Sequence, residues 1–261
     1  MKRERIGVCE GVLRSGSFEE DVASASAAGV HGLGLSSGAV DPVGVERAAQ
    51  LLADAGMVPS SHMTDIEILV SPRDSPEDPW RAIEVAAGLG APGVLVRTGP
   101  LGDRTIEDAD RRCVEWFAEM GSVAAQHGVR LMLEPMHPLL RPFSYVHTLR
   151  HAYELVAEAE AAGICADVGH LWWDRHLIDD FAAHVDRIVT VQVTDVNIEG
   201  LEHQRYEREQ LGRGELPLPH LLSAFEAAGY KGFYEIEILI RIPRAERVGL
   251  VRDAREWLEA L

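Results

Sequence analysis

Short apolar runs alternate with Ala-rich stretches along the whole chain. Five of these stretches end in a glycine dipeptide that is followed within a few residues by an apolar run: Ala28-Gly29, Ala55-Gly56, His127-Gly128, Ala162-Gly163 and Ala228-Gly229. Glycine after the last helical turn supplies the left-handed conformation with which many helices end. The apolar runs are typical of buried strands, because parallel sheets are covered on both faces. The repeated order of helix, glycine and strand therefore predicts βα units.

Eight such units can be counted in the 261 residues. We expect strands at residues 6–10, 32–36, 57–62, 93–97, 130–134, 164–167, 188–194 and 233–239. Helical stretches are expected near residues 19–28, 42–55, 77–89, 106–127, 145–161, 176–184, 218–228 and 244–260. This alternation favours the α/β class and a (β/α)8 TIM barrel that forms a single domain over residues 1–261. A dinucleotide-binding sheet has little support, because no Gly-x-Gly-x-x-Gly motif follows the first expected strand.

The connections between these elements differ in length on the two ends of the expected barrel. Residues 64–78 follow the third strand and residues 195–217 follow the seventh, and both connections lead from a strand to a helix. The helix-to-strand connections are short. Since barrel enzymes build their active sites from the strand-to-helix loops, this asymmetry predicts a working face at the carboxyl ends of the strands.

Four strands in the second half of the chain end on a polar side chain that can bind a metal or a proton. These side chains are Glu134, Asp167, Gln192 and Glu237. In a closed barrel the ends of neighbouring strands meet, so three carboxylates would repel one another in a place of low dielectric constant. A raised pKa or a bound cation relieves such repulsion. The oxygen-only set suits Mg²⁺ or Mn²⁺ better than Zn²⁺.

Each of the four residues also has a purely structural interpretation. Glu134 could end its strand in a salt bridge, Asp167 could cap the following turn, and Gln192 could make a structural hydrogen bond. Glu237 competes with Glu235, because strand alternation puts both on the same face. The repetition of the pattern at four strand ends favours a shared site.

At these positions the chain resembles the xylose-isomerase-like barrel superfamily of sugar isomerases and epimerases. The resemblance covers about residues 128–240, and in the first half of the chain it is only architectural. The motifs that carry it are Leu133-Glu134-Pro135-Met136-His137, Asp167-Val168-Gly169-His170, Val191-Gln192-Val193-Thr194-Asp195, the run from Arg208 to Glu215, and the run from Gly229 to Glu237.

The resemblance implies one divalent metal, Mn²⁺ or Mg²⁺ first and Co²⁺ or Zn²⁺ as further possibilities, held by Glu134, Asp167, Gln192 and Glu237. Glu134 and Glu237 would also be the catalytic acid–base pair. The implied reaction is isomerisation or epimerisation of a sugar, keto-sugar or small hydroxy-keto compound by removal of an α-proton and formation of an enediolate. Ketose epimerases of the group carry histidine at the third ligand position, and Gln192 is more similar to the hydroxypyruvate-isomerase branch.

Further residues are expected to contact the substrate. By the resemblance, His170 and Arg208 would contact substrate oxygens. His62, at the end of the third expected strand, and His137, just past Glu134, are expected to point toward the same mouth, and Trp172 is expected to form part of its wall. A core histidine, a solvated arginine or a packing tryptophan is the structural alternative in each case.

Three other functions compete with the isomerase interpretation. A lyase on the same scaffold, such as an inosose or dehydroshikimate dehydratase or a glycoside-cleaving eliminase, would begin with the same proton removal. An abasic-site endonuclease shares the barrel but needs several zinc-binding histidines, and it has histidine where this chain has Gln192. A non-catalytic barrel that binds a ligand or partner would leave the acidic set unexplained.

Composition and charge exclude some partners. The net charge is −17 and no run of Lys or Arg occurs, so nucleic acid is not an expected partner. No apolar stretch reaches the roughly 18 residues of a membrane span, so no membrane partner is expected. Three scattered cysteines and a charged N-terminus without a signal-peptide core predict a reduced, cytoplasmic protein. We expect a small carbohydrate-like substrate and, by the resemblance, a homo-oligomer, either a dimer or a tetramer.

Overall fold

The barrel strands form a closed ring in which every neighbouring pair is parallel. A computed structural model describes residues 1–70, 77–198 and 207–261. The order around the ring is β1-β10-β7-β6-β5-β4-β3-β2, which confirms the predicted (β/α)8 fold. The bounds are β1 Ile6–Cys9, β2 Gly32–Ser36, β3 Val58–Glu67, β4 Gly93–Arg97, β5 Arg130–Leu133, β6 Ala162–Asp167, β7 Ile188–Val193 and β10 Phe233–Ile236.

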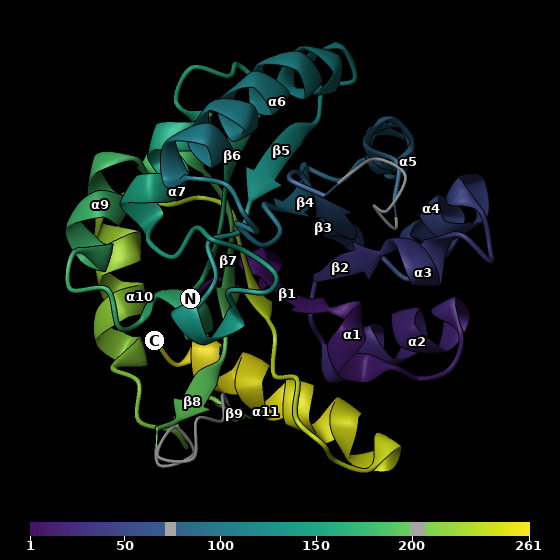
Figure 1. Cartoon of the computed structure of the whole chain (residues 1–261). Coiled ribbons are helices and arrows are strands. Elements are labelled where there is room, and N and C mark those ends of the chain that lie inside the picture. The colour runs from purple at the N-terminus through teal and green to yellow at the C-terminus, as the bar shows by residue number, and fades with distance from the viewer. Residues whose placement is uncertain (71–76, 199–206) are drawn as a thin grey trace.

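Helices surround this ring (Figure 1). The longer ones are α2 Phe18–Ala28, α4 Val45–Asp54, α5 Pro79–Leu89, α6 Ile106–Gln126, α7 Leu149–Val156, α9 Leu177–Ala183, α10 Leu218–Ala227 and α11 Arg247–Glu259. Shorter helical segments lie before β1 and in the connections between the longer elements. They are η1 Arg3–Arg5, α1 Glu10–Leu13, α3 Ser37–Val40, η2 Pro138–Leu140, α8 Val168–Leu171, η3 Val185–Arg187 and η5 Arg244–Glu246. The main core lies between the strands and the helices and is filled by aliphatic and aromatic side chains.

The predicted role of glycine holds at four of the five dipeptides. The glycines with positive φ include Gly29, Gly56, Gly128 and Gly229, each of which follows the end of a helix. The interpretation of the fifth was wrong, because Gly163 lies inside β6. A Cβ there would collide with the carbonyl oxygen of Arg187, so this glycine allows the close approach of two backbones.

The helix expected over residues 145–161 is shorter than predicted. It begins at Leu149, because the Thr148 side chain accepts a hydrogen bond from the His151 N–H and caps it. The residues before the cap are tied to β4 instead. Ser144 pairs with Gly99 in a parallel bridge, and its hydroxyl lies 2.9 Å from the Thr98 hydroxyl. Helix α7 ends at Val156, and β6 begins at Ala162, two residues before the predicted start.

The two long connections contain structure that the apolar pattern did not predict. Strand β3 continues to Glu67, so the first connection is partly strand. In the second, β8 Asp195–Asn197 and β9 Glu207–Glu209 form an antiparallel pair. Residues 71–76 and 199–206 of these predicted connections lie outside the described residues.

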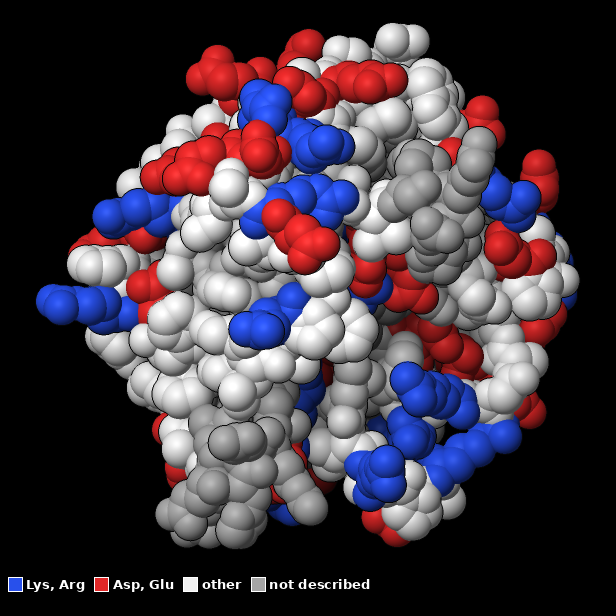
Figure 2. Space-filling view, in the orientation of Figure 1, with Lys and Arg blue, Asp and Glu red and all other residues white. Residues whose placement is uncertain are grey.

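The surface shows both charge signs. On the face drawn in Figure 2, Lys and Arg lie in separate groups among Asp and Glu, and the largest group is at the lower right. Over residues 1–70, 77–198 and 207–261, no helix has the length and apolar character needed to cross a bilayer. Cys9, Cys113 and Cys165 are buried thiols. Near the termini, the Met1 amino group lies 3.4 Å from the Glu259 carbonyl oxygen.

Candidate functional site

The four predicted strand-end residues come together at the carboxyl ends of β5, β6, β7 and β10. Asp167 is the last residue of β6, and its register partner is Gln192 on β7. Glu134 follows β5 and donates its backbone N–H to Val96, 3.0 Å away. Glu237 follows β10 in the same way, with its N–H 2.9 Å from the Val193 carbonyl oxygen. These backbone bonds extend the strand ladders and so fix where each side chain starts.

His170 joins the carboxylates from the turn of α8 that Asp167 begins. The Asp167 Oδ1 atom accepts a hydrogen bond from the Gly169 N–H at 2.7 Å, which caps that turn. The Nε2 atom of His170 lies 3.3 Å from Asp167 Oδ2 and 3.7 Å from Glu134 Oε1. One ligand atom from each of these three buried residues lies within 4.8 Å of the others. Asp167 is thus both the predicted N-cap and a member of the cluster.

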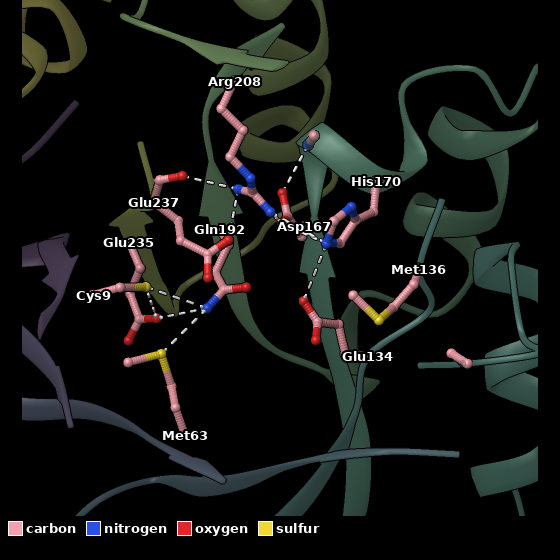
Figure 3. Close-up of polar contacts among 12 residues, drawn as sticks. Cys9, Met63, Glu134, Met136, Asp167, His170, Gln192, Arg208, Glu235 and Glu237 are labelled. Atoms are coloured by element: carbon pink, nitrogen blue, oxygen red, sulfur yellow. Dashed lines mark hydrogen bonds and ion pairs between the residues drawn. The ribbon is translucent and has the colours of Figure 1, made fainter. Parts of the chain in front are cut away.

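Arg208 reaches the same cluster from β9. Its Nη2 atom lies 2.5 Å from Asp167 Oδ2 and 3.2 Å from His170 Nε2. Its Nη1 atom lies 2.6 Å from Glu237 Oε2 and 2.9 Å from the Glu237 carbonyl oxygen. In Figure 3, Glu237 lies to the left of Asp167, and Glu134 lies below His170.

Burial and crowding shift the pKa values of the cluster. Burial first, and then Asp167, raise the pKa of Glu134 to about 7. Burial also raises the pKa of Glu237 well above its usual value, with further increases from Asp167 and Glu134 and a decrease from Arg208. For Asp167, burial acts upward, but Arg208 and His170 outweigh it and hold its pKa below the usual value. Burial lowers the pKa of His170 to about 4, so its imidazole is neutral at pH 7.

The donor set fits a divalent cation. Gln192 directs Nε2 toward Cys9, Met63 and Glu235, each of which lies within 3.9 Å of that atom. Its Oε1 atom is buried and has no hydrogen-bond partner, and it points to the side on which Glu134 and His170 lie (Figure 3). A buried carbonyl oxygen without a donor costs about 1–3 kcal/mol. A cation held by this oxygen and the carboxylates would remove that cost, and the neutral His170 nitrogen is a further possible ligand.

His137 and Trp172 lie beside this cluster. Their rings are stacked with centroids 6.2 Å apart, and His137 contributes to the lowered pKa of His170. The His137 Nδ1 atom accepts the Leu139 N–H at 3.2 Å and caps η2. The structure therefore places both predicted substrate contacts at the mouth, and their role toward a substrate stays a prediction.

His62 is not brought to the cluster. Its Nδ1 atom lies 3.1 Å from the Leu35 carbonyl oxygen, and its Nε2 atom lies 3.3 Å from the Ser37 hydroxyl. It lines a separate cavity of about 290 Å³ against α5, together with Asp41 and Arg81. A register shift between β2 and β3 places Ser61 and Met63 on the inner side, and His62 between them faces outward.

Glu235 is the sequence-based alternative to Glu237, and both side chains lie inside the barrel. Glu235 pairs in register with Gln192 and is fully buried one layer below the cluster. The alternation of β10 predicts this shared face, but it does not tell which of the two carboxyl groups reaches the mouth. Cys9 and Met63, which also contact the Gln192 amide, carried no signal in the sequence.

Similarities to known proteins agree with this architecture. The sequence model described as xylose isomerase-like TIM barrel matches residues 22–261, whereas no curated protein matches the chain. Protein SMc04130 from Sinorhizobium meliloti 1021 is 24% identical, with 99% of this chain and 98% of that chain covered and a TM-score of 0.87. The apo form of the 3-keto-D-glucoside 4-epimerase YcjR from E. coli is 18% identical, with 98% and 99% covered and a TM-score of 0.82. The IolI protein, solved with a zinc atom, is 16% identical, with 96% of both chains covered and a TM-score of 0.83.

Proposed function

The chain belongs to the xylose isomerase-like TIM barrel family, and we propose that it is a divalent-metal-dependent isomerase or epimerase. Its substrate class is sugars, keto-sugars or small hydroxy-keto compounds. The observation that carries the proposal is the partnerless, buried Gln192 Oε1 atom beside the Glu134–Asp167–His170 group. The epimerase and the zinc-containing protein among the structural relatives support the same class of site.

The residues proposed to hold the metal are Glu134, Asp167, Gln192 and Glu237, with Mn²⁺ or Mg²⁺ as the expected ion. Three carboxylates and an amide oxygen form a hard oxygen set, which suits these ions. Participation of His170 would widen the choice to Co²⁺ or Zn²⁺. When bound, the cation would stabilise negative charge that develops on the substrate after an α-proton is lost.

Glu134 and Glu237 are proposed to move the proton. They follow β5 and β10, which are separated by β6 and β7 in the ring, so a substrate placed between them presents an α-carbon to both. One carboxylate takes the proton from that carbon and leaves an enediolate. Protonation of the neighbouring carbon gives isomerisation, and protonation of the same carbon from the other face gives epimerisation.

Arg208 and His170 are proposed to orient the substrate oxygens. The guanidinium of Arg208 carries N–H donors in a fixed plane, which suits a carbonyl and an adjacent hydroxyl group. Its contacts with Asp167 and Glu237 place those donors between the two sides of the site. His137 and Trp172 would form one wall.

A panel of ketoses, keto-glycosides and hydroxy-keto acids in D₂O tests the proposal. Wild type with Mn²⁺ or Mg²⁺ is expected to incorporate one deuterium at an α-carbon, detected by mass spectrometry. Glu134→Gln and Glu237→Gln are each expected to reduce this rate at least about 100-fold, the usual contribution of a positioned acid or base. Deuterium in an isomer or epimer supports the proposal. Loss of water or an aglycone would replace it with a lyase, and absence of exchange with every compound and metal would refute it.

A further inference from the structure

A buried polar cluster lies inside the barrel below the acidic group, and the proposed mechanism gives no role to two of its members, Glu235 and Cys9. It consists of Glu235 on β10, Cys9 on β1 and the side-chain amide of Gln192 on β7. Glu235 Oε2 lies 3.4 Å from Gln192 Nε2 and 3.5 Å from Cys9 Sγ, and Cys9 Sγ lies 3.3 Å from Gln192 Nε2. A carboxyl group in a barrel core costs free energy unless polar partners compensate for its burial. Its place here therefore requires a reason beyond packing.

The barrel wall is shaped to admit this carboxyl group. A Cβ on Gly34 would lie 2.9 Å from Glu235 Oε1, so only glycine leaves the space on β2. The register shift between β2 and β3 brings Ser60 and Ser61 beside the same carboxyl group. Burial raises the pKa of Glu235, and these two hydroxyl groups, together with Gln192 and Cys9, act in the opposite direction. The neighbours on four strands, β1, β2, β3 and β7, thus surround Glu235.

The atoms that contact the Gln192 side-chain amide determine its orientation. Its Nε2 atom faces a carboxyl oxygen, a thiol sulfur and, at 3.9 Å, the thioether sulfur of Met63. A thioether and an ionised carboxylate can only accept a hydrogen bond, and the Cys9 thiol directs its one proton to Glu235. The inverted amide would place its carbonyl oxygen against these atoms and would be repelled. The Oε1 atom must therefore turn to the opposite side, toward Glu134 and His170 (Figure 3).

We propose that Glu235 is a positioning residue that holds the Gln192 amide with its carbonyl oxygen directed at the metal cluster. Cys9 and Met63 complete the acceptor side of this arrangement. The inference rests on the proposed function, because the expected partner of the Gln192 oxygen is the divalent metal. Hydrogen-bond partners behind a metal ligand fix its orientation, and their removal commonly costs 10–100-fold in metal affinity.

Titration of Mn²⁺ into the metal-free protein, followed by calorimetry, tests the role of Glu235. Glu235→Leu and Gln192→Leu are each expected to weaken the Mn²⁺ Kd at least about 10-fold. The double variant is expected to bind no more weakly than Gln192→Leu, because both changes remove the same ligand. Glu235→Gln keeps an acceptor oxygen and is expected to stay within about threefold of wild type by the same reasoning. Cys113→Ala, a buried change at the α6 layer, serves as the matched control.

The outcomes separate this inference from the proposed function. If wild type binds Mn²⁺ but Glu235→Leu binds equally well, the positioning role is refuted and the metal site stands. Additive losses in the double variant, or equal losses in Glu235→Gln and Glu235→Leu, would also refute it. If wild type binds neither Mn²⁺, Mg²⁺ nor Zn²⁺, both proposals fail together. Circular dichroism of each metal-free variant checks folding, and Glu235→Met replaces Glu235→Leu if the latter does not fold.

Discussion

At the scale of single residues, Arg208 supplies positive charge to a crowded group of carboxylates. Its side chain is 8% exposed, and it contacts Asp167, which is fully buried, and Glu237. Removal of one partner from a buried ion pair costs far more than the pair contributes, because the other charge stays buried. Since Arg208 occupies the oxygens that are proposed to ligate a metal, the guanidinium and the cation compete for Asp167 Oδ2.

The raised pKa of Glu134 predicts a pH-dependent difference between wild type and Glu134→Gln. Its pKa rises from 4.5 to about 7 in the folded protein, so the folded state binds this proton more tightly than the unfolded state. The resulting stabilisation is complete below pH 4.5 and is lost as the pH rises through about 7. In metal-free protein, the Tm of Glu134→Gln should therefore gain on that of wild type between pH 5 and pH 8. Thermal unfolding followed by circular dichroism measures the difference.

The same scans contain their own control. Other groups, His170 among them, titrate in both proteins, so the difference between the two Tm values reports the charge of Glu134 together with its effect on the pKa of Glu237. A saturating amount of Mn²⁺ should reverse the trend for wild type, because a bound cation stabilises the ionised carboxylate. A Tm difference that stays constant from pH 5 to pH 8 would contradict the raised pKa of Glu134.

The sequence predicted the positions of some site residues correctly and of others wrongly. Glu134, Asp167, Gln192 and Glu237 were found because an apolar run that ends on a polar group is visible in the sequence. The prediction for His62 was wrong for a physical reason. Strand β3 contains one extra residue relative to β2 at a register shift, and it continues to Glu67. Alternation counted along the chain cannot detect such a shift, and a strand that continues past His62 does not leave it at a strand end.

At the scale of elements, the β8–β9 hairpin delivers Arg208 to the barrel. Asp195 anchors this hairpin with its carboxylate, which accepts the N–H groups of Val196 and Leu216 at 3.0 Å and of Gly212 at 3.1 Å. Asp195 is 1% exposed. A Cβ at Gly214 would collide with the carboxylate, so the loop is shaped around it.

Asp195→Ala is expected to loosen the hairpin and to destabilise the protein by about 3 kcal/mol, because three backbone N–H groups lose their charged acceptor. Hydrogen–deuterium exchange should show faster exchange in residues 207–216, and urea unfolding should give the loss of stability. Asp54→Ala removes one exposed contact, with Gln50 on α4, and should change neither readout. Unchanged protection of residues 207–216 in Asp195→Ala would show that the hairpin is held by other contacts.

Strands were predicted best where an apolar run in the sequence is buried on both faces in the barrel. The strands that end in the cluster were found within three residues at each end, since parallel strands are apolar on both faces. The hairpin could not be found from an apolar pattern, because β9 is the charged sequence Glu207-Arg208-Glu209. Only the family resemblance, which assigned Arg208 to the site, indicated that this hairpin lies near the cluster.

At the scale of the whole molecule, closure of the barrel joins the start of the chain to its end. Strand β1 pairs with β10, and Arg5 reinforces this junction. Its Nε and Nη2 atoms donate to the carbonyl oxygens of Gly232 and Tyr230 at 3.1 and 2.9 Å. Its guanidinium also lies over the rings of Tyr230 and Tyr234, 5.5 and 5.3 Å from their centroids.

Arg5→Ala is expected to lower the free energy of unfolding by about 2–3 kcal/mol, because charge-assisted hydrogen bonds and two cation–π contacts are lost at the closing seam. Urea denaturation should show this as a shift in midpoint. Arg81→Ala is the matched control, because its ion pair with Asp41 is largely exposed and such pairs contribute at most about 1 kcal/mol. Equal effects of the two changes would show that Arg5 does not hold the closure.

Mn²⁺ titration calorimetry on metal-free protein decides whether the residues at the carboxyl ends of β5, β6, β7 and β10 form one divalent-metal site. Wild type and the surface control Asp108→Asn are each expected to bind one Mn²⁺ per chain. Asp167→Asn should bind at least about 100-fold more weakly, because a charged ligand at the centre of the cluster becomes neutral. Absence of Mn²⁺ binding in wild type, or wild-type affinity in Asp167→Asn, would refute the metal site.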